Sequence, residues 1–187
     1  MPVSRLDTKI ATPRWRYGTP AIVLHWALAA LIVFMVVLGW WMMTIERQPQ
    51  GPWWFDLHRS IGMLVAALVL LRIVWRLGHR PDPLPPGMPA WQIMLSGWTQ
   101  ALLYACMVVL PVTGFVGSMY SRAGIRFFGI ELPKVPVNRA LSHQLFEIHS
   151  AIIWVLVGLV ALHVAGALKH QWVDRDSLLQ RMWPARA

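Results

Sequence analysis

Long stretches without any charged residue separate short polar segments along this chain. The uncharged stretches are residues 17–45, 60–71, 83–121 and 148–168. A helix needs roughly 20 consecutive, mostly apolar residues to cross the hydrocarbon core of a bilayer. Three of the stretches reach that length, and the second reaches it if the helix extends over 53–77 with Arg72 near one end. The pattern therefore predicts four membrane-spanning helices.

The expected architecture follows from these spans. We place them at about 20–45, 53–77, 91–120 and 146–170. Pro20 suits the first turn of a helix, where the N–H that proline lacks has no partner in any case. The proline-rich segment 81–87 cannot lie inside a helix and is expected to be a loop. We expect 1–187 to form a single domain with its core over 14–183, an all-α membrane protein built as a four-transmembrane-helix bundle.

Composition supports a membrane protein and excludes several other classes. Hydrophobic residues make up 57% of the chain and charged residues only 13%, whereas soluble domains average about 25% charged residues. A net charge of +9 would suit a nucleic-acid binder, but such proteins gather their cations on one face. Here the cations stand between the uncharged stretches, so we expect no nucleic-acid partner. The one cysteine, Cys106, excludes an intrachain disulfide, a thiolate zinc site and haem attached through CxxCH.

The distribution of Lys and Arg predicts the orientation of the bundle. With four spans, both termini and the loop between the second and third spans lie on one side of the membrane. That side carries eleven cations, which are Arg5, Lys9, Arg14, Arg16, Arg72, Arg76, Arg80, Lys169, Arg175, Arg181 and Arg186. The other side carries six, which are Arg47, Arg59, Arg122, Arg126, Lys134 and Arg139. Because cytoplasmic loops carry the excess of Lys and Arg, we expect both termini in the cytoplasm.

Four histidines lie within or at the edges of the predicted spans: His25, His58, His149 and His163. Ionisable groups inside a membrane span are costly, and each one is a functional hypothesis. His149 and His163 lie 14 residues apart on the fourth span. At about 100° per residue, that separation falls about 40° short of four full turns and covers about 21 Å along the helix. The two side chains therefore share one face at two depths.

The other two histidines match those depths. His25 and His163 both lie near the cytoplasmic ends of their spans, and His58 and His149 both lie near the opposite ends. Two facing imidazoles from different helices can hold a low-spin b-type haem iron at both axial positions, which leaves one-electron transfer as its role. We therefore predict two non-covalent haem b groups per chain, one held by His25 and His163 and the other by His58 and His149.

Other interpretations of these histidines remain open. A histidine in a membrane helix can simply form a hydrogen bond between helices. A His-lined metal transporter is another alternative, although such a path usually adds carboxylates or thiolates, and Glu147 at one edge is the only candidate acid. His79, His143 and His170 lie in loops or at span ends and are interpreted as solvated surface residues.

Arg72 is a further candidate cofactor-binding residue. It follows His58 by 14 residues and so lies on the same helix face, at the level of His25 and His163. A guanidinium suits a carboxylate with two parallel hydrogen bonds, so Arg72 can pair with a propionate of the haem at that level. The alternative is that Arg72 extends toward lipid phosphate and helps to set the topology.

Several short motifs follow one another along the chain. They are Leu24-His25-Trp26, Leu57-His58-Arg59-Ser60-Ile61-Gly62, Leu71-Arg72-Ile73-Val74-Trp75-Arg76, Leu110-Pro111-Val112-Thr113-Gly114, Phe128-Gly129-Ile130-Glu131-Leu132-Pro133, Glu147-Ile148-His149, and 162–170 with Asp174-Arg175-Asp176. In this order and spacing, over about residues 14–183, they resemble the prokaryotic cytochrome b561 family, which is related to the b-type cytochrome subunits of nickel-iron hydrogenases.

The resemblance implies a multi-pass protein of the bacterial inner membrane, surrounded by lipid, with two b haems on the same four histidines. Members of the family pass electrons between a donor and the quinone pool, so the implied substrate is ubiquinone. One branch oxidises superoxide on the periplasmic side, and another serves as the membrane electron-transfer subunit of a periplasmic oxidoreductase such as hydrogenase. The short chain favours the stand-alone branch, with superoxide or a protein as the periplasmic electron donor. The sequence identifies no catalytic residue and no quinone site.

Overall fold

Four long helices form the structure, a computed structural model that describes residues 16–79, 87–176 and 178–183. They are α1 (Thr19–Thr44), α2 (Gly51–Gly78), α3 (Ala90–Met119) and α4 (Arg139–Lys169). Each is long and apolar enough to cross a membrane. The predicted fold class, an all-α bundle of four membrane-spanning helices, is therefore confirmed, and the chain is an integral membrane protein.

The predicted bounds of the first three spans lie within two residues of the helix ends, but α4 begins at Arg139 rather than near residue 146. Its first two turns include Arg139, Ser142, His143 and Gln144, so hydropathy alone does not detect them. A local signal does exist. Asn138 precedes the helix, and its side-chain oxygen accepts the N–H of Leu141 at 3.1 Å, which satisfies one of the unpaired donors of the first turn.

A two-stranded antiparallel hairpin interrupts the connection between α3 and α4, where the sequence predicted only a loop. Strand β1 (Arg126–Phe127) pairs with β2 (Ile130–Glu131). The two turn residues, Phe128 and Gly129, have φ values of 46° and 90°, as the two-residue turns of type I′ require. Gly129 adopts this conformation without the steric cost that Phe128 bears.

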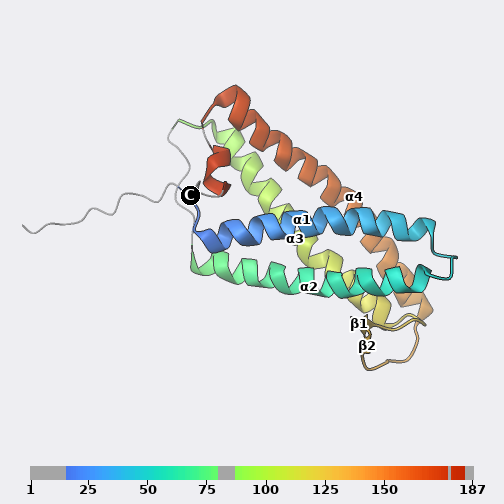
Figure 1. The fold of residues 1–187 in the computed structure, drawn as a ribbon. Helices are drawn as coiled ribbons and strands as arrows, with labels where there is room; N and C mark the ends of the chain where they lie inside the picture. The colour runs from blue at the N-terminus through green and yellow to red at the C-terminus, as the bar shows by residue number, and fades with distance from the viewer. Residues whose placement is uncertain (1–15, 80–86, 177, 184–187) are drawn as a thin grey trace, which may run out of the picture.

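The helices pack as two pairs, α1 with α2 and α3 with α4, and α2 joins the pairs by packing on α3 (Figure 1). One buried apolar cluster, around Leu28, Val65 and Val69, lies between α1 and α2. A second cluster, around Cys106, Leu110 and Leu156, lies between α3 and α4. The two clusters meet at Ile32 of α1, which packs against both. The histidines described below lie between helices of different pairs.

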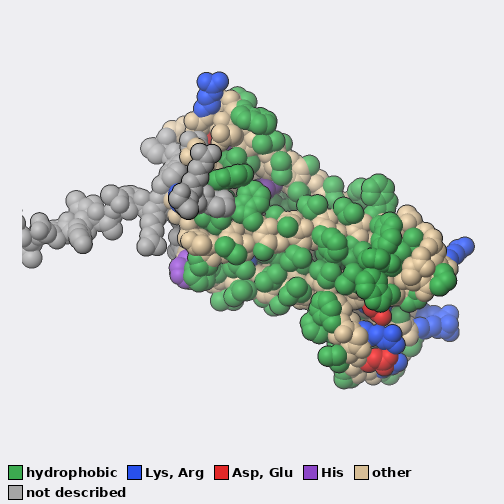
Figure 2. Space-filling view, in the orientation of Figure 1, with side chains coloured by type: hydrophobic (Ala, Val, Ile, Leu, Met, Phe, Trp, Pro, Cys, Tyr) green, Lys and Arg blue, Asp and Glu red, His purple; other side chains and the backbone are tan. Residues whose placement is uncertain are grey.

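Apolar side chains cover the long outer faces of the bundle, whereas charged side chains gather at its ends (Figure 2). A contiguous apolar surface of this extent is unfavourable in water and is typical of contact with lipid. Both ends of the described chain lie together at one end of the bundle, which we call the terminal end (Figure 1). The β1–β2 hairpin lies at the other, which we call the hairpin end.

Five of the cations counted for the orientation, Arg5, Lys9, Arg14, Arg80 and Arg186, lie outside the described residues. At the terminal end, α4 continues as a π-helical turn (His170–Asp174), and a short 3-10 helix (Leu178–Met182) follows. This last helix lies against the start of α1, where the N–H of Tyr17 donates to the carbonyl of Arg181 at 3.1 Å.

Ser60 anchors the hairpin to α2. Its side chain is 1% exposed, and Oγ lies 2.8 Å from the carbonyl of Asp56 and 3.1 Å from that of Arg126. The same oxygen accepts the N–H of Phe128 at 2.9 Å. One buried hydroxyl therefore connects α2 to both strand β1 and the turn.

Replacing this hydroxyl tests the anchor. Ser60→Ala leaves the buried N–H of Phe128 without its acceptor, at a cost of about 1–3 kcal/mol. We expect faster hydrogen exchange of the Phe128 amide and a lower melting temperature. Ser96→Ala is the control, because the Ser96 hydroxyl bonds only to the carbonyl of Ile93 in its own helix. Equal exchange rates at Phe128 in the wild type and Ser60→Ala would show that the hairpin is held by other contacts.

Candidate functional site

The structure brings the four span histidines together as two facing pairs. At the terminal end, His25 of α1 faces His163 of α4, with ring centres 6.2 Å apart. At the hairpin end, His58 of α2 faces His149 of α4, with ring centres 6.4 Å apart. These are the pairs that helix depth predicted, and all four side chains are partly buried.

The ring separations fit one metal ion between each pair. Two metal–nitrogen bonds of about 2.0 Å each, with roughly 1 Å from each nitrogen to its ring centre, give about 6 Å. Direct hydrogen bonds between the two rings would bring the centres closer. The spacing therefore suits two axial ligands of one iron at each level.

Hydrogen bonds orient His149 for this role. Its Nδ1 lies 2.9 Å from the carbonyl of Leu110 on α3, and the hydroxyl of Thr113 lies 3.3 Å from the same nitrogen. Because a carbonyl only accepts, Nδ1 carries the proton, and Nε2 is left as the ligand atom. Sequence reasoning did not find Leu110 or Thr113. The segment 110–114 drew attention only as part of the family resemblance.

Two glycines lie directly against the rings of the hairpin-end pair. A Cβ at Gly39 would approach His58 Cε1 to 3.2 Å, and a Cβ at Gly114 would approach His149 Cε1 to 3.2 Å. In addition, His58 Nδ1 is buried without a hydrogen-bond partner within the described part of the chain. A buried polar atom without a partner is unusual in a folded protein. Because Gly39 and Gly114 have no side chains, there is room beside each ring for a flat ligand.

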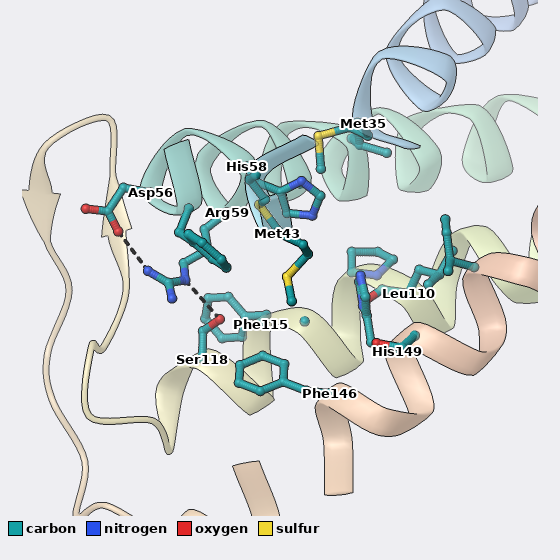
Figure 3. Close-up of a pocket in the computed structure, with 18 of the residues that line it drawn as sticks. Met35, Met43, Asp56, His58, Arg59, Leu110, Phe115, Ser118, Phe146 and His149 are labelled. Atoms are coloured by element: carbon teal, nitrogen blue, oxygen red, sulfur yellow. Dashed lines mark hydrogen bonds and ion pairs between the residues drawn. The ribbon is translucent and has the colours of Figure 1, made fainter. Parts of the chain in front are cut away.

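A cavity of about 690 Å³ extends from His58 and His149 toward the hairpin, within the range of small-molecule and cofactor sites. Figure 3 shows the two imidazoles on opposite sides of this space, with Met35, Phe115 and Phe146 among its apolar lining residues. Most of the lining between the rings is apolar, and the charged side chains of the lining lie toward the hairpin end. This distribution fits a flat macrocycle with carboxylates at one edge.

The polar end of the cavity has balanced charges. Arg59 donates to Asp56 at 2.8 Å and to the hydroxyl of Ser118 at 3.2 Å (Figure 3). Asp56 also lies 3.7 Å from Arg126, and Glu46 is the second acid of the lining. Two arginines thus face two carboxylates, and the positive excess of the hairpin end lies outside the cavity.

The hairpin carries its own ion pair at this rim. The Arg126 guanidinium donates to Glu131 Oε1 at 2.7 Å and 3.2 Å. This bond, followed by the charge of Lys134, holds the pKa of Glu131 below its usual range. The same hydrogen bond raises the pKa of Arg126. Both groups are solvent-exposed, so the pair fixes their charges and contributes little stability.

Arg72 lies in the terminal-end site, as its helix face predicted. Its Nη2 is 3.3 Å from His25 Nδ1, its Nη1 donates to the carbonyl of Ala21 at 3.1 Å, and its Nε donates to the hydroxyl of Tyr104 at 3.1 Å. Tyr104 was not predicted. Within residues 16–79, 87–176 and 178–183, Arg72 has no carboxylate partner, so this part of the bundle holds an uncompensated positive charge.

The remaining histidines differ from one another. His79 stacks on Trp75 with ring centres 4.0 Å apart, and His143 is exposed and lies 3.5 Å from Glu147. His170 is only 16% exposed and lies 2.6 Å from a carboxylate oxygen of Asp176. The interpretation as a solvated surface residue is therefore wrong for His170, because the chain folds back after α4 and brings acids onto it.

Comparison with known proteins decides the family. The family model for prokaryotic cytochrome b561 matches residues 16–185, nearly the whole chain. The chain belongs to the prokaryotic cytochrome b561 family.

Individual relatives match along almost their full length. The chain is 29% identical to "Cytochrome b561 homolog 2" of Escherichia coli (strain K12), with 89% of this chain and 90% of the relative covered. It is 26% identical to "Probable superoxide oxidase CybB" of Yersinia pestis, with 91% and 97% covered. It is 30% identical to "Cytochrome b562" of Cereibacter sphaeroides, with 91% and 96% covered.

Membership of the cytochrome b561 family supplies the chemistry that the site geometry suggests. Such proteins are membrane b-type cytochromes that bind haem and transfer electrons. The residues present fit that cofactor at the hairpin end, where facing imidazoles, close glycine backbone and an apolar cavity occur together. Bis-histidine ligation closes an iron to small ligands and suits it to one-electron transfer.

The glycine beside His149 gives a direct test of this fit. Gly114→Ala places a methyl group 3.2–3.3 Å from the imidazole, so the ring must shift or strain at a cost of about 1–3 kcal/mol. We expect less haem per chain, measured as the pyridine haemochrome. The control is Gly158→Ala, whose Cβ meets no atom within 4 Å and which should keep the wild-type haem content. Equal haem content in both variants would show that this backbone does not border the cofactor.

Proposed function

We propose that this cytochrome b561 family member holds two b haems and carries electrons from a periplasmic donor to the quinone pool of the bacterial inner membrane. The observation that carries the proposal is the presence of two pairs of facing imidazoles, with ring centres 6.2 Å apart in one pair and 6.4 Å apart in the other. One helix, α4, contributes to both pairs through residues 14 positions apart, about 21 Å along its axis. Two one-electron centres stacked in this way span much of the bilayer.

Each haem would have its own ligands. His25 and His163 would hold one, and His58 and His149 the other. Bound haem would supply reversible one-electron chemistry at each level. The protein's part is to present Nε2 of each imidazole. For His149 the bond from Nδ1 to the carbonyl of Leu110 does this, and it also raises the basicity of the ligand.

Arg72 would bind a propionate of the haem at the terminal end. With a metal on Nε2 of His25, the proton lies on Nδ1, and an arginine cannot accept from it because arginine only donates. Arg72 Nη2, now 3.3 Å from that nitrogen, would then donate to a carboxylate instead. The uncompensated charge of Arg72 favours such an anion.

The orientation would place both termini in the cytoplasm, so the hairpin end would face the periplasm. The support is the excess of Lys and Arg on the terminal side, eleven against six. His58 and His149 would then form the entry site for electrons, and His25 and His163 the exit site. Cavity and hairpin would lie on the periplasmic side.

Superoxide is the donor that we propose. The relative from Yersinia pestis carries the name of a probable superoxide oxidase, and the hairpin end has a small positive excess, six cations against four acids. In this reaction two superoxide ions each lose one electron and become O₂. One quinone takes up those two electrons and two protons from water and becomes quinol. Electron delivery in single steps is the chemistry that b haem supplies.

The haem pairing is tested by single and double ligand variants. We expect two haems per wild-type chain and one in each of His58→Ala, His149→Ala, His25→Ala and His163→Ala. His58→Ala/His149→Ala should also keep one haem, because both changes remove the same site. His58→Ala/His163→Ala should keep none. Pyridine haemochrome content and the reduced-minus-oxidised spectrum measure this. One haem in the last variant would show that the pairs are assigned wrongly, and a folded wild-type protein without haem would refute the function.

The donor is tested by the salt dependence of haem reduction. The excess charge of the hairpin end is modest, so steering of an anion should be modest too. We expect superoxide generated by pulse radiolysis to reduce the haem, with a rate constant that falls severalfold as ionic strength rises from about 0.01 to 0.15 M. If quinol reduces the haem rapidly and superoxide does not reduce it, superoxide is excluded as the donor.

A further inference from the structure

Direct packing between α1 and α4 contributes little to the separation of His25 from His163. The extensively packed pairs are α1 with α2, α3 with α4 and α2 with α3, and α1 with α4 is not among them. Yet His25 lies on α1 and His163 on α4. α2 and α3 connect the two helices indirectly, and the segment after α4 connects them directly, close to the two histidines.

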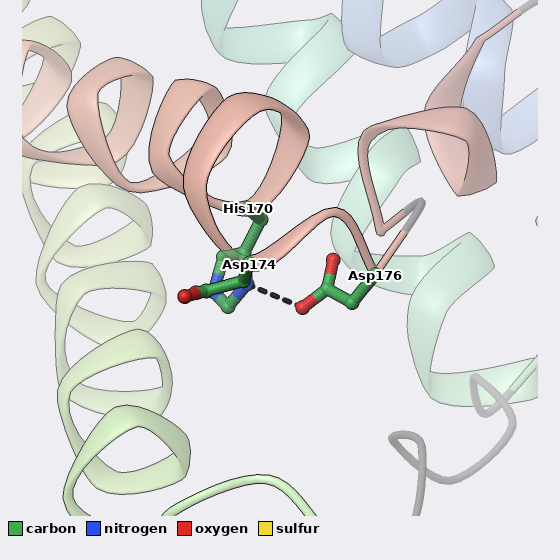
Figure 4. Close-up of side chains that lie close together, drawn as sticks. All are labelled: His170, Asp174 and Asp176. Carbon is green, nitrogen blue, oxygen red and sulfur yellow. Dashed lines mark hydrogen bonds and ion pairs between the residues drawn. The ribbon is translucent and has the colours of Figure 1, made fainter.

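The segment after α4, residues 170–176 and 178–183, is firmly attached to the end of α4. The chain reverses at Arg175, whose φ is 54°, and the N–H of Asp176 then donates to the carbonyl of His170 at 3.3 Å. The imidazole of His170 lies between two carboxylates, 2.6 Å from Asp176 and 3.2 Å from Asp174 (Figure 4). These bonds fix the direction in which the segment leaves the helix.

The three side chains of this cluster have the composition of a metal site, with ligand atoms within 4.8 Å of one another. Their oxygens already have protein donors, however. Lys169 bonds to Asp174, and the N–H of Leu178 donates to Asp176 at 3.1 Å. A cation would have to displace Lys169, so the cluster is better explained as an ion-pair lock.

The same segment is attached to α1 at its far end. Trp26 Nε1 donates to the carbonyl of Met182 at 2.8 Å, and its ring lies 5.7 Å from that of Trp183. Arg16 donates to the carbonyls of Gln180 and Trp183. Trp26 is the neighbour of His25 in sequence, and the two rings are 5.3 Å apart.

We infer that this segment is a strap between α4 and α1 that positions His25 and His163 for their shared ligand, with His170 as the positioning residue. The inference rests on the proposed function, since it takes haem to be that ligand. It predicts that breaking the lock at His170 loosens only the terminal-end site. The hairpin-end site, some 21 Å away along α4, serves as an internal control.

The test uses two backgrounds, each with a single haem. His58→Ala retains the His25–His163 site and His25→Ala retains the other. In each we measure the rate at which haem passes to excess apomyoglobin. His170→Ala should speed release about tenfold in the His58→Ala background, since a charge-assisted hydrogen bond is worth about that factor. It should leave the rate unchanged in the His25→Ala background. His143→Ala, which removes an exposed histidine–glutamate pair at the other end of α4, should change neither.

A second variant attacks the strap from α1. Trp26→Phe keeps an aromatic ring but removes the donor to Met182, and it should speed release in the same background. The low-spin electron paramagnetic resonance signal of that haem should also shift in both variants. Equal release rates for His170→Ala and His143→Ala, or acceleration in both backgrounds, would refute the strap. If neither background binds haem, it is the proposed function that fails.

Discussion

The structure depends on holding two pairs of imidazoles apart inside an apolar bundle. Helices that associate in a membrane close on one another through van der Waals contact, and a polar group left between them needs a partner. Here the rings face each other at more than 6 Å and His58 Nδ1 has no partner in the described chain. A ligand between the rings and a scaffold that resists collapse would both stabilise this arrangement. The two buried apolar clusters provide such a scaffold, one centred on each helix pair, with Ile32 packed against both.

The four helices contribute unequally to that scaffold. α4 carries one histidine of each facing pair, so this one helix sets the spacing between the two pairs along the bundle. α3 carries none of the four histidines but supports His149 through the carbonyl of Leu110 and the close backbone of Gly114. The carbonyl belongs to the residue that precedes Pro111, which lies inside the helix. α1 and α2 supply the opposing histidines and pack on each other. A change in any helix therefore affects at least one pair.

Much of this could be predicted from the sequence, because it depends on short-range periodicity. Hydropathy located the spans, and helical geometry put His149 and His163 on one face at two depths. What could not be predicted depends on contacts between residues far apart in the chain. The carbonyl that orients His149 belongs to residue 110, the glycine against His58 is residue 39, and Ser60 holds a hairpin centred on residue 128. His170 was misjudged for the same reason, since its acidic partners meet it only after the chain reverses at Arg175.

The two ends of the bundle differ in a way that suits different partners. At the hairpin end, the cavity beside His58 and His149 runs toward a rim where arginines and carboxylates neutralise one another. At the terminal end, the segment after α4 lies against α1, and Arg72 keeps a positive charge with no carboxylate partner in the described chain. A small anion that donates one electron must come close to the group that accepts it. A quinone arrives through the lipid and needs an exit site that faces the bilayer. The polar mouth of the cavity meets the first of these needs, and for that reason the proposed function places electron entry at the hairpin end.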